Sequence, residues 1–107
     1  MDDEKIKCVV VNSRKEDAQR LDTLLQQIGL TRTLSIVSSP INRINIIVNG
    51  KPDIVFVYIE RDGPQVFKII EETRQNGLNP EFIIIADDKD YTPQAVKSRV
   101  FDYLLKP

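Results

Sequence analysis

Five short apolar runs divide the chain and predict the strands of a sheet. They span Ile6–Val11, Leu34–Val37, Asp53–Ile59, Phe82–Ala86 and Phe101–Leu105. The third and fourth runs are apolar at nearly every position instead of alternating with polar residues. Continuous runs of this kind are typical of parallel strands that are covered on both faces.

Between these runs, apolar residues recur at helical spacing. The first helical stripe covers Ala18–Ile28 and is followed by Gly29, a residue typical of a helix C-terminus. The start of this helix is predicted at Asn12 or Ser13, since either side chain could cap it. Glu16 follows Ser13 at the spacing of a capping box.

Three further helices are predicted by the same spacing. The second begins at Ser38-Ser39-Pro40 and ends at Asn49-Gly50, because the following Lys51-Pro52 forbids its continuation. The third buries a face that extends over Val66–Thr73. A short fourth helix covers Pro93–Ser98.

The alternation of strands and helices predicts an α/β three-layer sandwich around a five-stranded parallel sheet. For one domain of this length, the flavodoxin-like strand order 2-1-3-4-5 is the expected topology. That fold places its working residues at the carboxyl ends of the strands. The residues at those positions are Asn12, Ser13, Tyr58, Ile59, Glu60, Ala86, Asp87 and Lys106.

Composition restricts the chemistry of this single domain, residues 1–107. The 107 residues include one cysteine, Cys8, and no histidine, which excludes Cys/His zinc sites and Ser/His or Cys/His catalytic pairs. The net charge is −1 and the basic residues are scattered, so contact with nucleic acid would need a segment outside this chain. No apolar stretch is long enough to cross a bilayer, and the polar start predicts a cytoplasmic protein.

Two strings in the chain resemble a known family. The segments KPDIVFVYIE and FDYLLKP are similar to the CheY-like receiver domains of response regulators, and most of all to receivers that precede LytTR-type DNA-binding domains. The resemblance covers nearly the whole chain. It implies a two-component signalling domain in which carboxylates hold Mg²⁺ and one aspartate accepts a phosphoryl group.

The resemblance also assigns positions for that chemistry, residue by residue. The family's acidic pair falls on Asn12 and Ser13, and its phosphoacceptor aspartate falls on Tyr58. Its hydroxyl residue falls on Ala86. The family's lysine and its aromatic switch residue are retained, as Lys106 and Tyr103.

These departures remove the reactive groups. Asn12 and Ser13 supply neutral oxygens, so Mg²⁺ is not expected, and no other cofactor is implied. Tyr58 is a poor nucleophile because only roughly one phenol in a thousand is ionised at neutral pH. We expect Tyr58 to pack in the former pocket. We expect Lys106 to pair with an acid, namely Asp87, Asp88 or Glu60.

The sequence therefore predicts a degenerate receiver that acts by contact with a protein partner or by dimerisation, without phosphorylation. The family continues into a fifth helix after the motif that ends this chain. We therefore expect either a fragment of a longer regulator, with an attached DNA-binding domain as one hypothesis, or a dimer that covers the open face. The alternative is a flavin or other small-ligand domain, although no glycine-rich loop follows the first strand.

Overall fold

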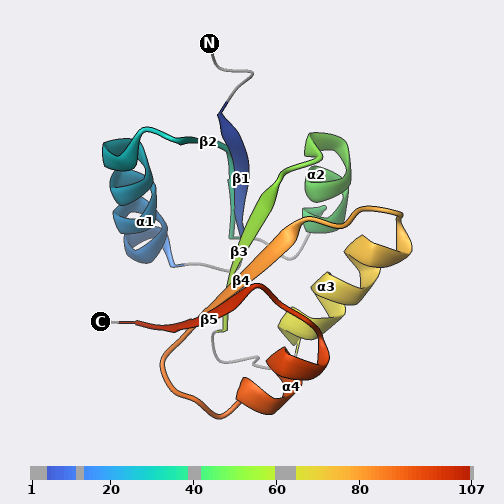
Figure 1. Ribbon diagram of the computed structural model, residues 1–107. Helices are drawn as coiled ribbons and strands as arrows, with labels where there is room; N and C mark the ends of the chain where they lie inside the picture. Colours follow the sequence, from blue (N-terminus) through green and yellow to red (C-terminus); the bar gives the residue numbers. More distant parts are fainter. Residues whose placement is uncertain (1–4, 12–13, 39–41, 60–64, 107) are drawn as a thin grey trace.

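The computed structural model describes residues 5–11, 14–38, 42–59 and 65–106. In these ranges, five strands and four helices alternate along the chain (Figure 1). The strands are β1 (Ile6–Val11), β2 (Thr31–Val37), β3 (Ile54–Tyr58), β4 (Glu81–Ala86) and β5 (Asp102–Leu105). The helices are α1 (Lys15–Ile28), α2 (Arg43–Gly50), α3 (Gln65–Gln75) and α4 (Thr92–Lys97).

The strands form one parallel sheet in the order β2-β1-β3-β4-β5. This order confirms the predicted flavodoxin-like topology. Figure 1 shows α1 on one side of the sheet and α2 and α3 on the other. Ala95 of α4 is buried in the same cluster as residues of α2 and α3, so α4 also belongs to that second side.

The alternation of side chains along each strand divides the core into two clusters, one on each face of the sheet. On β1, Val9 and Val11 join the cluster under α2, α3 and α4, whereas Cys8 and Val10 join the cluster under α1. We call the first side the three-helix face and the second the α1 face. The continuous apolar runs thus reflect burial on both sides, as predicted.

Two predicted helix starts are wrong. The N-cap of α1 is Arg14, not Asn12 or Ser13, which lie outside the described residues, and the Arg14 side chain makes no capping hydrogen bond. Arg14 is extended, and its carbonyl accepts the first helical bond, from the N–H of Ala18 at 2.9 Å. The second helix begins at Arg43 and not at Ser38-Ser39-Pro40, of which Ser39 and Pro40 lie outside the described residues. Asn42 is left-handed (φ 64°), a conformation that interrupts a helix and that Asn tolerates.

Two other boundaries are informative. Gly29 ends α1 in the left-handed region (φ 77°), and its N–H donates to the carbonyl of Leu25 at 3.1 Å, as the sequence predicted. The second strand starts three residues before the predicted Leu34–Val37, at Thr31. None of the helices in the described part of the chain is long and apolar enough to cross a membrane.

Candidate functional site

The carboxyl ends of β3, β4 and β5 meet at one edge of the sheet, as the parallel order requires. Tyr58 ends β3, Ala86 ends β4, and Lys106 directly follows β5. The backbone N–H of Lys106 donates to the carbonyl of Ala86 at 2.8 Å, which fixes the two strand ends side by side. Asn12 and Ser13, the positions assigned to the acidic pair, lie outside the described residues.

Tyr58 is a packed core residue at this edge. Its side chain is 4% exposed and belongs to the cluster under α1, with Phe56 and Ile85 as sheet neighbours. Its hydroxyl donates to the backbone carbonyl of Asp17 at 3.4 Å. The ring therefore lies under the first turn of α1, and the only polar atom of the side chain reaches a backbone acceptor.

Among the described residues, two carboxylates and one aromatic ring lie close to Lys106. Its Nζ lies 3.2 Å from Oδ2 of Asp17 and 3.6 Å from Oδ1 of Asp87. The same nitrogen lies 5.4 Å from the centroid of the Tyr58 ring, within cation–π range. Of the three acids expected for Lys106, the structure shows Asp87. Asp88 is not among the described ion pairs of the lysine, and Glu60 lies outside the described residues.

Asp17 is the partner that the sequence alone did not identify. It lies in the first turn of α1, next to Glu16. The first turn of a helix that follows β1 lies above the carboxyl edge of the sheet, where Lys106 also lies. An acidic residue in that turn was therefore a usable signal. Since Asp17 and Lys106 are 22% and 16% exposed at their side chains, their contact is only partly screened by water.

The described side chains at this edge differ in their chemistry. Ala86 is buried (1% exposed) and has only a methyl group as its side chain. Among the described residues, no three acidic, cysteine or histidine side chains gather in a group that could hold a metal ion. The described structure brings together the ammonium group of Lys106, the two carboxylates close to it, the phenol ring of Tyr58 and the methyl group of Ala86.

Tyr103 lies on the opposite side of the sheet from Lys106. It is half-buried against the cluster of the three-helix face. Its hydroxyl donates to the backbone carbonyl of Asp88 at 2.8 Å, which ties β5 to the loop between β4 and α4. Burial raises the pKa of this phenol above its ordinary value, and the nearby charges of Asp88 and Asp90 act in the same direction.

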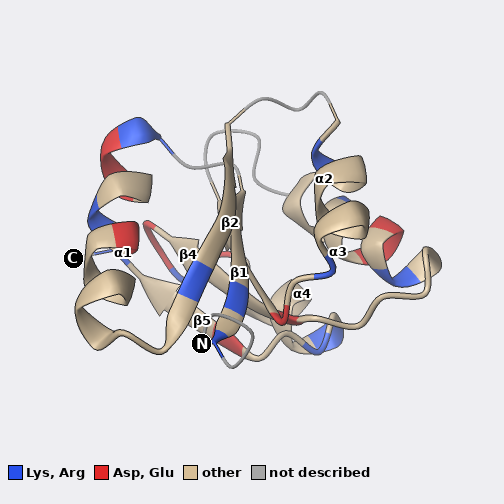
Figure 2. Ribbon diagram, turned by 90° about the horizontal axis from the view of Figure 1, so that it is seen from above, with Lys and Arg blue, Asp and Glu red and all other residues tan. Residues whose placement is uncertain are grey.

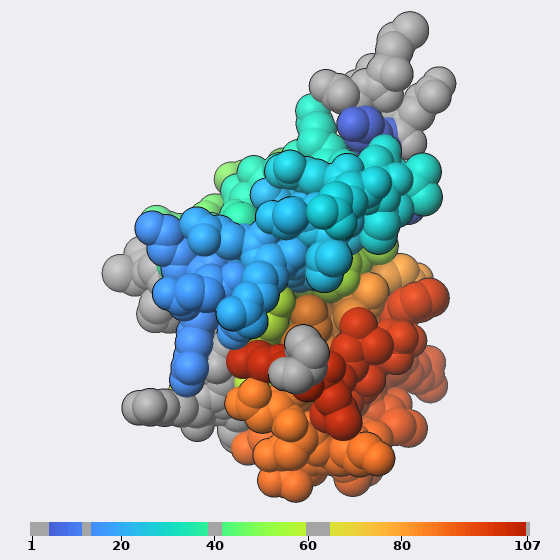
Figure 3. Space-filling model, turned by 90° about the vertical axis from the view of Figure 1, so that its left-hand side faces the viewer, coloured from blue at the N-terminus to red at the C-terminus, as the bar shows by residue number. Residues whose placement is uncertain are grey.

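A groove adjoins the site on the α1 face, between α1 and β5. Its volume is about 300 Å³. The lining residues are Asp17, Arg20, Leu21, Leu24, Tyr58, Ile85, Leu104, Leu105 and Lys106. Figure 3 views the molecule from this side, with α1 in blue and β5 in red, and parts of the sheet visible between them. The groove is mainly apolar, and its charged residues lie toward the carboxyl edge.

Comparison with known proteins extends the description. No family model matches the sequence, and no curated protein matches it. Solved structures do match: the fold is that of the CheY-like receiver domains. One is a DNA-binding response regulator of the LuxR family from Staphylococcus aureus, with 22% identity and a TM-score of 0.81 over 94% of this chain and 85% of that one.

Two further structures show the same likeness. The response regulatory domain of protein mrkE from Klebsiella pneumoniae has 20% identity and a TM-score of 0.82, over 95% of this chain and 84% of that one. A CheY-like receiver domain from Methylobacillus flagellatus has 15% identity and a TM-score of 0.81, over 96% and 87%. These likenesses establish the CheY-like fold. They do not test the resemblance to LytTR-type receivers, which stays a prediction.

Proposed function

We propose that this domain is a receiver-like signalling module that works without phosphorylation, through contact with a protein partner or with a second copy of itself. The observation that carries the proposal is the arrangement of Lys106 with Asp17, Asp87 and the ring of Tyr58. In the family that the sequence resembles, the lysine at this position binds phosphoryl oxygens. Here two carboxylates of the same chain lie within 4 Å of it.

The position assigned to the acceptor supports the same conclusion. Tyr58 is buried, and its hydroxyl donates to the backbone carbonyl of Asp17 in the first turn of α1. A phosphoryl donor would have to displace the packed ring, and no described carboxylate replaces the missing aspartate. The assignments of Asn12 and Ser13 as a neutralised acidic pair, and of Ala86 as a lost hydroxyl, rest on the resemblance and are part of this proposal.

Two surfaces are the proposed places of contact. One lies around Tyr103 and α4, the side that the resemblance implies. The other is the groove between α1 and β5, whose rim carries exposed apolar side chains: Leu24 is 57% exposed, Leu104 43% and Leu105 45%. Burial of such surface on association is favourable by about 25 cal/mol per Å².

The test is exposure of the protein to a small-molecule phosphodonor with Mg²⁺, followed by intact-mass measurement. We expect no added phosphoryl group in the wild type or in the matched variant Tyr58→Phe. An adduct on the wild type that Tyr58→Phe lacks would show that the phenol is an acceptor and would contradict the proposal. An acid-labile adduct on both proteins would contradict it as well, by revealing another acceptor.

An attached DNA-binding segment is a compatible and more specific proposal. It is supported by the resemblance to receivers that precede LytTR-type domains, and the reading frame after Pro107 tests it. The flavin-binding alternative is less well supported, because the three solved structures described above are all from response regulators. Flavin absorbance in the purified protein would favour that alternative.

A further inference from the structure

The outer edge of β2 lies at the opposite end of the sheet order from β5. With seven residues, β2 is the longest of the five described strands, and among them it pairs with β1 alone. The N–H of Ile6 donates to the carbonyl of Leu30 at 2.9 Å, so the backbone groups of Leu30 point toward β1. Since these directions alternate along a strand, the backbone groups of Thr31 and Thr33 point outward. Within the described residues, no backbone partner is found on that outer side.

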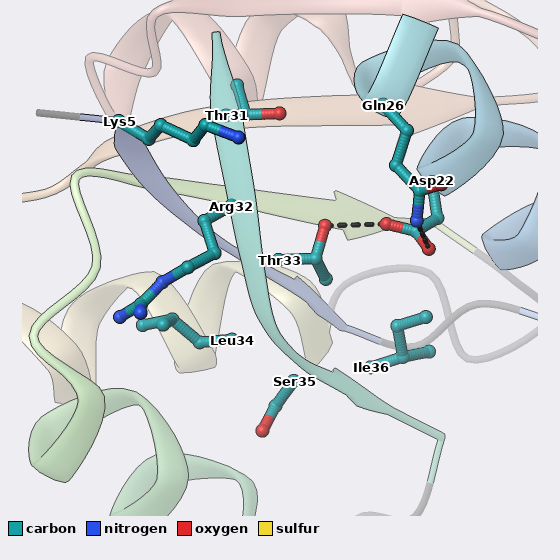
Figure 4. A pocket seen from close by; sticks show the side chains of 9 residues that line it. All are labelled: Lys5, Asp22, Gln26, Thr31, Arg32, Thr33, Leu34, Ser35 and Ile36. Carbon is teal, nitrogen blue, oxygen red and sulfur yellow. Dashed lines mark hydrogen bonds between the residues drawn. The ribbon is translucent and has the colours of Figure 1, made fainter. Parts of the chain in front are cut away.

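A groove of about 480 Å³ follows this edge. It is lined by Lys5, Asp22, Gln26, Thr31, Arg32, Thr33, Leu34, Ser35 and Ile36. Figure 4 shows Lys5 extending toward β2, and Thr33 turned to the side opposite Arg32. Asp22, the one acid of the lining, accepts hydrogen bonds from Thr33 Oγ1 at 2.7 Å and from Gln26 Nε2 at 3.0 Å.

Three cations gather at the amino-terminal end of the same edge. Lys7 and Arg32 are direct partners in the parallel register of β1 and β2. Lys5 immediately precedes β1 and lines the groove together with Arg32. Figure 2 shows the blue segments of β1 and β2 next to each other. Within the described residues, none of the three forms an ion pair; Asp53 accepts a hydrogen bond from the backbone of Lys7, not from its ammonium.

This placement has a cost for the isolated domain. Like charges on directly paired residues destabilise a sheet, and an open strand edge invites pairing with other chains. Both costs are removed by one kind of occupant, an extended segment that pairs with the edge and carries negative charge. We infer that the outer edge of β2 binds an acidic, extended segment of a partner protein, which adds a strand to the sheet.

The features of the edge favour this occupant over two others. A second copy paired antiparallel over the amino-terminal half would bring Arg32 and Lys5 of the two copies together. In addition, the register shift between Cys8 and Val9 leaves Leu34 as an extra residue in β2, and such a bulge limits pairing along the whole edge. Nucleic acid is less suited, since the chain has a net charge of −1 and the cluster holds only three cations.

The inference is tested on the full 107-residue chain by NMR titration of backbone amides. The probe is an N-acetylated seven-residue peptide of alternating glutamate and valine, and the control peptide has lysine in place of glutamate. We expect the glutamate peptide to shift the amides of Thr31 and Thr33, with binding that weakens as salt is added. The lysine peptide should leave these amides unchanged.

Two variants separate charge from backbone pairing. Arg32→Glu should weaken binding of the glutamate peptide by roughly three- to tenfold, whereas Lys97→Glu, an equal change on the exposed surface of α4, should not. Thr31→Pro removes an outward N–H and should also weaken binding. If this variant does not fold, an N-methylated glutamate peptide, which cannot pair along one side, replaces it and should not bind.

Several results would overturn the inference. Equal binding of the two peptides would remove the role of charge, and no shift at Thr31 or Thr33 at millimolar peptide would remove the site. A single-stranded DNA oligonucleotide that binds more tightly, depends on Arg32 and ignores Thr31→Pro would assign the cluster to nucleic acid. Concentration-dependent broadening of β2 amides without peptide would assign the edge to a second copy. None of these outcomes bears on phosphorylation, so this inference and the proposed function can fail separately.

Discussion

The two faces of the sheet differ in how completely they are covered. The three-helix face buries its strand residues under α2, α3 and α4, and Ile84 and Val57 there have no exposed surface. Among the described helices, α1 alone lies on the α1 face; it covers β1 and β3 and leaves the β5 side open, so that Leu104 is 43% exposed. The same apolar pattern in the sequence thus forms a closed core on the three-helix face and lines an accessible groove on the α1 face.

This difference indicates a division of roles. The three-helix face supplies most of the packing that holds the domain together. The α1 face is fully buried under α1, where Cys8 and Val10 have no exposed surface, and becomes accessible toward Leu104. The Lys106–Asp17 ion pair lies at the carboxyl edge of this accessible part and joins β5 to α1 across it.

Neighbouring isoleucines on β4 give the largest expected effect. Ile84 is fully buried on the three-helix face, and Ile85, on the α1 face, is 9% exposed and lines the groove. Ile84→Ala should lower the free energy of unfolding by about 3–5 kcal/mol, because it leaves a cavity that cannot collapse. Ile85→Ala should lower it by about 2 kcal/mol, because water can enter the space. Urea denaturation measures both; equal losses would contradict the difference between the faces.

Cys8 tests whether the α1 face is dry beneath its helix. Burial, followed by the charge of Asp53, raises the pKa of its thiol from 9.0 to about 11. The folded state therefore holds the proton more tightly than the unfolded chain does. The resulting stabilisation is complete below pH about 9 and is lost as the pH rises toward 11, a change on the order of 2 kcal/mol.

The matched variant for this measurement is Cys8→Ala. Its unfolding free energy should fall less steeply between pH 9 and 11, although it starts from a lower value at neutral pH because of the lost packing. The two proteins share every other ionisable group, so the difference between the two curves isolates the thiol. Parallel curves would show that water reaches Cys8.

The ion pair at the edge of the groove has a smaller expected effect. Asp17→Asn should lower the free energy of unfolding by about 1 kcal/mol, since its contact with Lys106 at 3.2 Å is partly shielded from water. Asp87→Asn is the control. That carboxylate is 71% exposed and lies 3.6 Å from the lysine, so its loss should cost less than about 0.5 kcal/mol. A double-mutant cycle with Lys106→Met would give the coupling of each pair, and an equal coupling would contradict the larger effect expected for Asp17 than for Asp87.

The fold was predictable because its central strands β1, β3 and β4 are buried on both faces, which leaves an unambiguous signal in the sequence. The predicted runs Asp53–Ile59 and Phe82–Ala86 each lie within one residue of the observed bounds of β3 and β4. The start of β2 was missed because Thr31, Arg32 and Thr33 are polar, as an edge strand allows. The start of the second helix was also missed, because it is set by the left-handed backbone of Asn42, and the spacing of apolar residues does not reveal backbone conformation.

The candidate site was predictable in part. Family resemblance pointed to Tyr58 and Lys106, and the structure brings them into contact. Asp17 was missed because its role depends on a contact between the two ends of the chain, and helical periodicity describes only which face a residue occupies. The groove between α1 and β5 could not be predicted from the local sequence pattern either, because it depends on which strands α1 covers.

The smallest expected change in stability belongs to the open part of the α1 face, where association is the more sensitive measurement. Leu104→Gln should alter the free energy of unfolding by less than about 0.5 kcal/mol, because the side chain is already largely hydrated. If the groove is a contact surface, the same change should reduce concentration-dependent association, measured by light scattering coupled to size exclusion. Leu30→Gln is the matched control: Leu30 is 64% exposed but does not line the groove. A wild type that stays monomeric at high concentration, or an equal effect of both variants, would argue against self-association through this face and leave a different protein as its partner.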